Sequence, residues 1–273
     1  MAAALIDRPG RYRHWAVASI ISLALLPSVA LADRTYFVRT YTPYVDEAGE
    51  SEVALWLTSK SGKQDPAEDA TLLPRAEWEH AISSRLTGAV LLNFLRPSSG
   101  PFTLESASLQ AVYQFAEPGR LAADPAVYLE VTESGDELEI YSQLLLARHF
   151  KGCVGALNLK SEFSFRHDQA ERLESGAVLE NGVAGEIAGG LAYGVGRRLA
   201  VGIEAYARTE HANFGPQSAA IVSIGPSLNL QMGEIQLAVG ALRQVQGTPH
   251  TSDVLNLVDF ERTELRVVIS VEL

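Results

Sequence analysis

The last ten residues of the chain, Glu264–Leu273, read ELRVVISVEL and decide the fold. The odd-numbered positions of this stretch are all apolar: Leu265, Val267, Ile269, Val271 and Leu273. Because successive side chains of a β-strand point to opposite faces, the alternation predicts a strand with one apolar face. A soluble edge strand with such a face invites aggregation, whereas a strand paired on both sides in a closed barrel turns that face toward lipid.

The same period of two recurs along the chain before this stretch. Strands are predicted at 52–60, 73–83, 86–95, 103–116, 124–132, 136–147, 157–165, 183–193, 199–208, 222–230, 234–241 and 264–273. No segment after the first 32 residues shows a helix-length period of 3.6, so no helix is predicted there. The sequence therefore predicts an all-β fold, a single up-and-down antiparallel transmembrane β-barrel of about 12 strands.

The connections between these segments support a membrane barrel. Short links rich in turn-forming residues lie at 84–85, 117–120, 150–152, 196–198 and 232–234. They alternate with mostly longer polar links at 61–72, 96–102, 166–182, 210–217 and 244–261. The link Glu133–Asp136 is short where a long one is expected. Short turns at one rim and longer loops at the other are typical of such barrels, with the short turns toward the periplasm.

The first 32 residues predict a cleaved secretory signal. Arg8, Arg11 and Arg13 precede an apolar run, Trp15–Leu26, and small residues follow at Ala30–Ala32. The alternative is a membrane anchor, but a spanning helix needs about twenty apolar residues and this run is shorter. The domain prediction is thus a signal at 1–32 and one barrel domain at 33–273.

Composition narrows the classes of partner. The chain has 273 residues and a formal charge of −11, and residues 33–273 contain no cluster of Lys and Arg, so no nucleic-acid partner is predicted. Cys153 is the only cysteine and cannot form an internal disulfide. No cofactor is predicted.

The export signal and the alternating final strand resemble those of bacterial outer-membrane β-barrel proteins as a class. Leu273 departs from the pattern, because the class usually ends on an aromatic residue. The stretch Thr35–Trp56 also resembles the start of uncharacterised transporter-like barrel families. The resemblance implies a location in the bacterial outer membrane and two partners, the membrane lipid and the outer-membrane insertion machinery. The sequence does not determine the oligomeric state.

If the apolar positions face lipid, the alternate positions line the lumen. The predicted lumen-lining residues are Glu77, Glu79, Glu130, Glu139, Lys160, Glu162, Glu186, Glu204, Tyr206, Arg208, Glu264 and Arg266. Carboxylates outnumber cations in this set, so the sequence predicts a passive, porin-like channel for small cations or polar solutes. The alternative is a closed structural or interaction barrel, in which Glu–Arg pairs fill the interior.

An enzyme is not predicted, and neither catalytic nor metal-binding residues are assigned. The chain has no G-x-S-x-G motif, and His149, His167, His211 and His250 fall in or beside turns and loops. A membrane-embedded hydrolase and a soluble β-sandwich remain as weaker alternatives.

Aromatic residues before the first strand have two interpretations. Tyr36, Phe37, Tyr41 and Tyr44 could anchor at the periplasmic membrane interface, or they could plug the lumen from that side. Other aromatics are predicted to form girdles at the rims: Trp78, Phe94, Tyr113, Phe115, Phe163, Phe165 and Tyr193.

Overall fold

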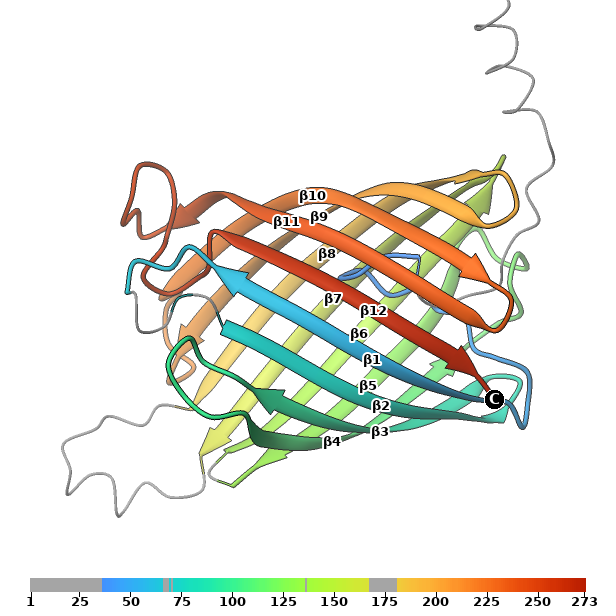
Figure 1. Cartoon of the computed structure of the whole chain (residues 1–273), viewed down its shortest axis with the longest axis horizontal. Coiled ribbons are helices and arrows are strands. Elements are labelled where there is room, and N and C mark those ends of the chain that lie inside the picture. The colour runs from blue at the N-terminus through green and yellow to red at the C-terminus, as the bar shows by residue number, and fades with distance from the viewer. Residues whose placement is uncertain (1–35, 66–68, 70, 136, 167–180) are drawn as a thin grey trace, which may run out of the picture.

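The structure is a closed barrel (Figure 1). It is a computed structural model that describes residues 36–65, 69, 71–135, 137–166 and 181–273. Within these ranges the chain forms twelve β-strands, each antiparallel to its neighbours in sequence, and β12 pairs with β1 to close the wall. The predicted all-β, up-and-down barrel is confirmed. The predicted signal at 1–32 lies outside the described residues and stays a prediction.

The strands lie where the period of two predicts them. Their bounds are β1 (Ser51–Ser61), β2 (Thr71–Ser83), β3 (Leu86–Leu95), β4 (Thr103–Gln114), β5 (Asp124–Ser134), β6 (Glu137–Phe150), β7 (Cys153–Arg166), β8 (Gly182–Val195), β9 (Leu199–Ala212), β10 (Ala219–Met232), β11 (Ile235–Thr248) and β12 (Thr263–Glu272). Several strands extend beyond the predicted ends, because alternation fades near the rims where both faces carry polar or small residues. None of the described residues forms a helix long and apolar enough to cross a membrane.

The two faces of the wall have opposite character. On the outside, Leu55, Leu109 and Ile203 are 55%, 66% and 51% exposed. On the inside of β10, Ser227 and Asn229 are buried. Apolar surface on this scale is stable only in a hydrocarbon environment, and a closed barrel satisfies its backbone hydrogen bonds within the wall. The barrel therefore spans a membrane.

Exposed aromatic side chains lie near the strand ends. Those that face outward are Trp78, Tyr113, Phe115, Phe163, Phe165 and Tyr193. Phe94 stacks on Phe102 with a centroid separation of 5.0 Å. His80 also lies outside, where it stacks on Trp78 and hydrogen-bonds the Ser51 hydroxyl over 2.9 Å. These rings are placed as interfacial aromatic girdles are in membrane barrels.

The rims differ in the length of their connections. Two-residue links join β2 to β3, β6 to β7 and β10 to β11 at one rim, which we call the short-turn rim. The opposite, long-loop rim carries connections such as 249–262, while the link 135–136 is short as the sequence indicates. At the short-turn rim the Leu273 N–H donates to the Ser51 carbonyl over 2.8 Å, so the wall closes there. This rim faces the periplasm in outer-membrane barrels.

Gly225 in β10 lies where the wall leaves no room for a side chain. A Cβ at this position would lie 1.7 Å from the Ala241 carbonyl oxygen of the neighbouring strand. Gly225→Ala is therefore expected to lower the free energy of unfolding by about 1–3 kcal/mol, because the backbone of β11 must move. Urea unfolding, followed by the heat-modifiable migration of the folded barrel on gels, measures the change.

Gly135→Ala is the matched control for this substitution. A methyl group there would meet nothing within 4 Å, and its stability is expected to match that of the wild type. Equal stability of the two alanine variants would contradict the close approach at Gly225.

Candidate functional site: the barrel lumen

The chain before β1 lies inside the barrel. We call residues 36–45 the plug segment; Figure 1 shows it in blue within the wall. At one end the ring of Tyr36 lies 5.7 Å from that of His149, and toward the other end the Tyr44 ring lies 5.0 Å from the same His149. Because His149 is next to the last residue of β6, the plug segment enters and leaves the lumen by the short-turn rim.

Tyr44 fixes the returning end of the plug segment. Its hydroxyl donates to Asp124 Oδ2 over 3.2 Å. Burial next to that carboxylate raises the pKa of Tyr44, so the phenol stays protonated and remains a donor.

Wall side chains satisfy the backbone of the plug segment. The carboxylate of Glu204 accepts the N–H groups of Val38, Arg39 and Thr40, each over 2.9 Å. Asn158 accepts the Tyr41 N–H over 2.6 Å and donates its amide to the Tyr41 carbonyl over 2.8 Å. Three backbone donors on one ionised carboxylate form a set of charge-assisted hydrogen bonds, the strong kind in proteins. The lumen wall therefore holds this segment in one position.

Apolar side chains of the plug segment fill spaces that glycines leave in the wall. A Cβ on Gly190 would lie 2.6 Å from the Phe37 ring, and one on Gly240 would lie 2.3 Å from Val38 Cγ2. Tyr41 lies between the rings of Tyr128 and Trp56, at centroid separations of 5.7 and 6.1 Å. Of the two interpretations of the early aromatics, the structure shows the plug.

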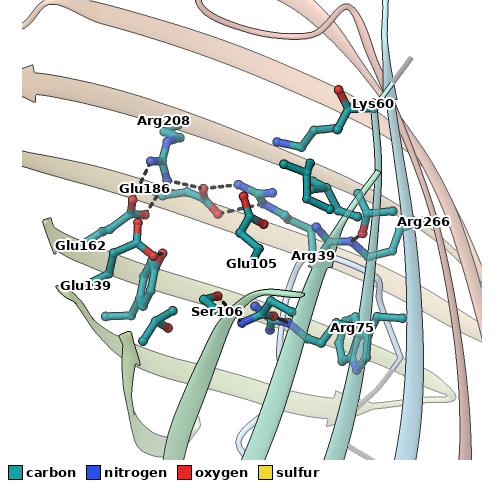
Figure 2. Close-up of a pocket in the computed structure, with 18 of the residues that line it drawn as sticks. Arg39, Lys60, Arg75, Glu105, Ser106, Glu139, Glu162, Glu186, Arg208 and Arg266 are labelled. Carbon is teal, nitrogen blue, oxygen red and sulfur yellow. Dashed lines mark hydrogen bonds and ion pairs between the residues drawn. The ribbon is translucent and has the colours of Figure 1, made fainter. Parts of the chain in front are cut away.

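Arg39 carries a positive charge into the centre of the lumen. Its guanidinium pairs with Glu186, with Nε 3.0 Å from Oε1, and with Glu264 Oε2 over 3.4 Å. The guanidinium carbon also lies 4.3 Å from the centroid of the Tyr206 ring. Burial opposes the charge, but the carboxylates of Glu186 and Glu264 outweigh it and raise the pKa of Arg39. The side chain thus stays cationic; Figure 2 shows it pointing toward Glu186.

A network of ion pairs covers the wall beside Arg39. Arg208 holds Glu162 with two hydrogen bonds of 2.8 and 3.0 Å (Figure 2). Its Nε donates to Glu210 over 2.9 Å. Lys160 lies 3.5 Å from Glu162 and 4.3 Å from the centroid of the Tyr141 ring. Strand register places these groups side by side on β7, β8 and β9.

Above the plug segment, toward the long-loop rim, lies a cavity of about 760 Å³. Arg39 and Tyr41 border it from the plug segment. Its carboxylates are Glu105, Glu130, Glu137, Glu139, Glu162, Glu186, Glu210, Asp259 and Glu261. Its cations are Arg39, Lys60, Lys63, Arg75, Lys160, Arg208 and Arg266. A smaller cavity of about 250 Å³ lies at the short-turn rim next to Tyr36, so the plug segment lies between the two.

The predicted lumen residues divide into two groups. Those that line the large cavity are Glu130, Glu139, Lys160, Glu162, Glu186, Tyr206, Arg208 and Arg266. Those that are buried inside the barrel but do not border this cavity are Glu77, Glu79, Glu204 and Glu264. In the second group, Glu204 and Glu264 contact the plug segment instead of the open space.

Sequence reasoning missed several charged groups of the cavity. Arg75 has the same parity as Glu77 on β2, and Lys60 has the same parity as Trp56 on β1, so strict alternation predicts both. Arg39 lies outside every alternating segment, and no sequence pattern near it predicts a place in the lumen.

Glu105 reaches the cavity through an irregularity in the wall. Asn93 pairs with Ser106 and Phe94 pairs with Leu104, which leaves Glu105 as an extra residue on β4. Such a β-bulge redirects side chains, and Glu105 lines the cavity together with Ser106 (Figure 2). A period of two assigns Glu105 to the outer face, which is why the sequence did not indicate it.

The described residues offer no candidate metal site and no candidate catalytic histidine. Within the part of the chain that the structure describes, no three His, Cys, Asp or Glu residues are grouped as metal ligands. His211 Nδ1 lies 3.1 Å from the Gly215 carbonyl oxygen, and His149 packs against the two tyrosines of the plug segment. His167 lies outside the described residues. That the chain is not an enzyme stays a prediction.

Solved structures with similar architecture include porins. The NanC porin matches with a TM-score of 0.52 and 9% sequence identity, over 80% of this chain and 98% of that one. The KdgM porin in complex with disordered oligogalacturonate matches with a TM-score of 0.51 and 8% identity, over 81% and 98%. Neither a known protein family nor a curated protein matches the sequence. The chain thus shares its barrel fold with these porins, and its own wall is a twelve-stranded β-barrel with the apolar exterior of a membrane-spanning protein.

Proposed function

We propose that the barrel is a passive channel for small polar solutes, cations among them. The cavity of about 760 Å³ carries the proposal, because it lies inside a membrane-spanning wall and is lined by charged groups. Charged groups facing an internal space lower the free energy of polar solutes and water there relative to the bilayer. The cavity borders the long loops, and loop 249–262 contributes Asp259 and Glu261 to its lining.

The charge of the cavity supports a mild preference for cations. Nine carboxylates line it, against seven Lys and Arg side chains. Most of these groups neutralise one another in pairs, as Lys60 does with Glu261 over 3.3 Å. Glu105 and Lys60 line the same cavity, and no ion pair joins them among the described residues. A small excess of negative charge in a confined space concentrates cations without excluding neutral solutes.

Charge reversal at Glu105 tests this function. In planar bilayers with a salt gradient, the wild-type protein is expected to conduct with a reversal potential that indicates cation preference. Glu105→Lys is expected to shift that potential toward anions, because it changes the charge inside the cavity by two. Glu133→Lys makes the same change on the outer face of β5 and is expected to leave the reversal potential unchanged. Identical reversal potentials for all three proteins would refute the permeation path.

A closed barrel is the second candidate, and the plug segment favours it. The segment fills the lumen between the two cavities and contacts several parts of the wall. A closed barrel predicts that folded protein never conducts, even after the plug segment is loosened by substitution.

A further inference from the structure

We propose that the plug segment, residues 36–45, is the gate of this channel: it closes the lumen when bound, and the path opens when it leaves toward the short-turn rim. The inference rests on the proposed function. Four features of the structure support it: the topology of the segment, its hinge, the nature of its contacts, and the charges that it would leave behind.

Topology allows the plug segment to leave without disturbing the wall. Tyr36 and Tyr44 both lie near His149, so the segment enters and exits by one rim, and its tip at Arg39–Tyr41 points away from that rim toward the large cavity. A loop with both ends on one side can withdraw without threading through the barrel or breaking a strand pair.

A hinge connects the plug segment to β1. Residues 47–49 are exposed, and Gly49 has a φ of +97°, a left-handed conformation that favours glycine. The wall already begins at Gly49: the Gly49 N–H donates to the Ala81 carbonyl over 2.8 Å, and the Ala81 N–H donates to the Glu50 carbonyl over 2.9 Å. Rotation about residues 47 and 48 therefore moves the plug segment while Gly49 and β1 stay bonded to β2.

The contacts that hold the plug segment are made by wall side chains. Glu204 and Asn158 bind its backbone, and Arg266 Nη1 donates to the Val38 carbonyl over 2.7 Å. When the segment leaves, these three side chains can replace their backbone partners with water. Water is available to them because the large cavity next to the segment is lined by polar groups. Ladder bonds of a true thirteenth strand would instead tie the segment to its neighbours along its length.

Withdrawal changes the charge of the lumen in one direction. Arg39 leaves with the segment, whereas Glu186 keeps Arg208 at 3.9 Å and Glu264 keeps Arg266 at 3.0 Å. Glu204 loses three backbone donors and gains none from the wall described above. Glu186 and Glu264 therefore stay paired, while the part of the lumen that the plug segment occupied loses one cation. The open channel is expected to prefer cations more strongly than the large cavity alone.

A reversible covalent lock tests the gate. A Cβ built on Gly240 lies 3.3 Å from Val38 Cβ, close to the roughly 3.5–4.5 Å that a disulfide spans. We would combine Val38→Cys and Gly240→Cys with Cys153→Ser, which removes the native thiol. Planar-bilayer conductance of the folded full-length protein is then recorded under oxidising conditions and again after reduction. Oxidation is expected to lower the conductance roughly tenfold or more, and reduction to restore it.

Two controls accompany the lock. Val38→Cys alone, in the same background, is expected not to respond to oxidant. A pair on the outer face of neighbouring strands, Val201→Cys with Leu228→Cys, joins register partners in the wall and is expected to leave conductance unchanged when oxidised. Phe37→Asp serves as a full-length release variant, because it places a carboxylate in the apolar contact with Gly190 and is expected to raise conductance.

The outcomes separate the gate from the channel. A fall in conductance on oxidation supports the gate. The gate is also supported if the reduced protein does not conduct and the Phe37→Asp protein does. Equal conductance of the oxidised, reduced and release variants overturns the gate and leaves the channel intact. Silence of all proteins, with folding verified by heat-modifiable migration, overturns the channel and the gate together.

Discussion

Glu204→Ala is expected to release the plug segment and to raise the ratio of open to closed channels about a hundredfold or more. The substitution removes the acceptor of three backbone N–H groups, at Val38, Arg39 and Thr40. A buried donor left without a partner costs about 1–3 kcal/mol, and about 1.4 kcal/mol corresponds to a factor of ten. Even with partial replacement by water, the loss exceeds roughly 3 kcal/mol. Single-channel open probability in planar bilayers measures the ratio.

A conservative variant and a control variant accompany Glu204→Ala. Glu204→Gln keeps one acceptor oxygen and is expected to give an intermediate open probability. Gln236→Ala removes another buried polar side chain of the inner face, one that contacts Ser270, and is expected to behave as the wild type. An open probability for Glu204→Ala equal to that for Gln236→Ala would show that the three hydrogen bonds do not hold the segment.

Arg208→Met is expected to lower the free energy of unfolding by about 3 kcal/mol. Arg208 contacts Glu162, Glu186 and Glu210, and its removal leaves the largely buried Glu162 without its main cation and takes a second cation from Glu186. Breaking a buried pair on one side costs about 3–5 kcal/mol, and the hydrated cavity nearby places the effect at the lower end. Urea unfolding in detergent micelles or lipid vesicles, read out by heat-modifiable migration, provides the measurement.

The matched control is Arg243→Met, which removes an arginine from the exposed outer face of β11. Such a surface change is expected to stay within about 0.5 kcal/mol of the wild type. Adding Glu162→Gln to Arg208→Met is expected to recover part of the stability, because it removes one orphaned charge. A loss below about 1 kcal/mol for Arg208→Met would mean that the network contributes little to the fold.

The wall of this barrel could be predicted from sequence because its determinant is local. Each strand meets hydrocarbon on one side and a polar interior on the other, so the period of two appears within every stretch of about ten residues. The same rule extends to lumen residues that the prediction omitted: Arg75 follows from Glu77, and Lys60 follows from Trp56.

What fills the lumen could not be predicted in the same way. Val38 and Glu204 are separated by 166 positions in the chain, and nothing near either residue encodes their contact. Glu105 enters the cavity only because of a bulge, which shifts the register that the alternation assumes. The expectation that carboxylates outnumber cations counted wall positions and lacked Arg39, Lys60 and Arg75, which bring the cavity closer to neutrality. Cation preference therefore stays a proposal.

The direction from which residues 36–45 enter the barrel decides which compartment has control over it. A solute that enters the large cavity from the long-loop rim meets Arg39 and Tyr41 of the plug segment and does not reach the two ends of that segment from there. Both ends lie at the short-turn rim, the rim that faces the periplasm in outer-membrane barrels, so a factor that releases the segment is expected to act from that side. The permeability of the barrel would then depend on conditions on the side of the membrane that the short-turn rim faces.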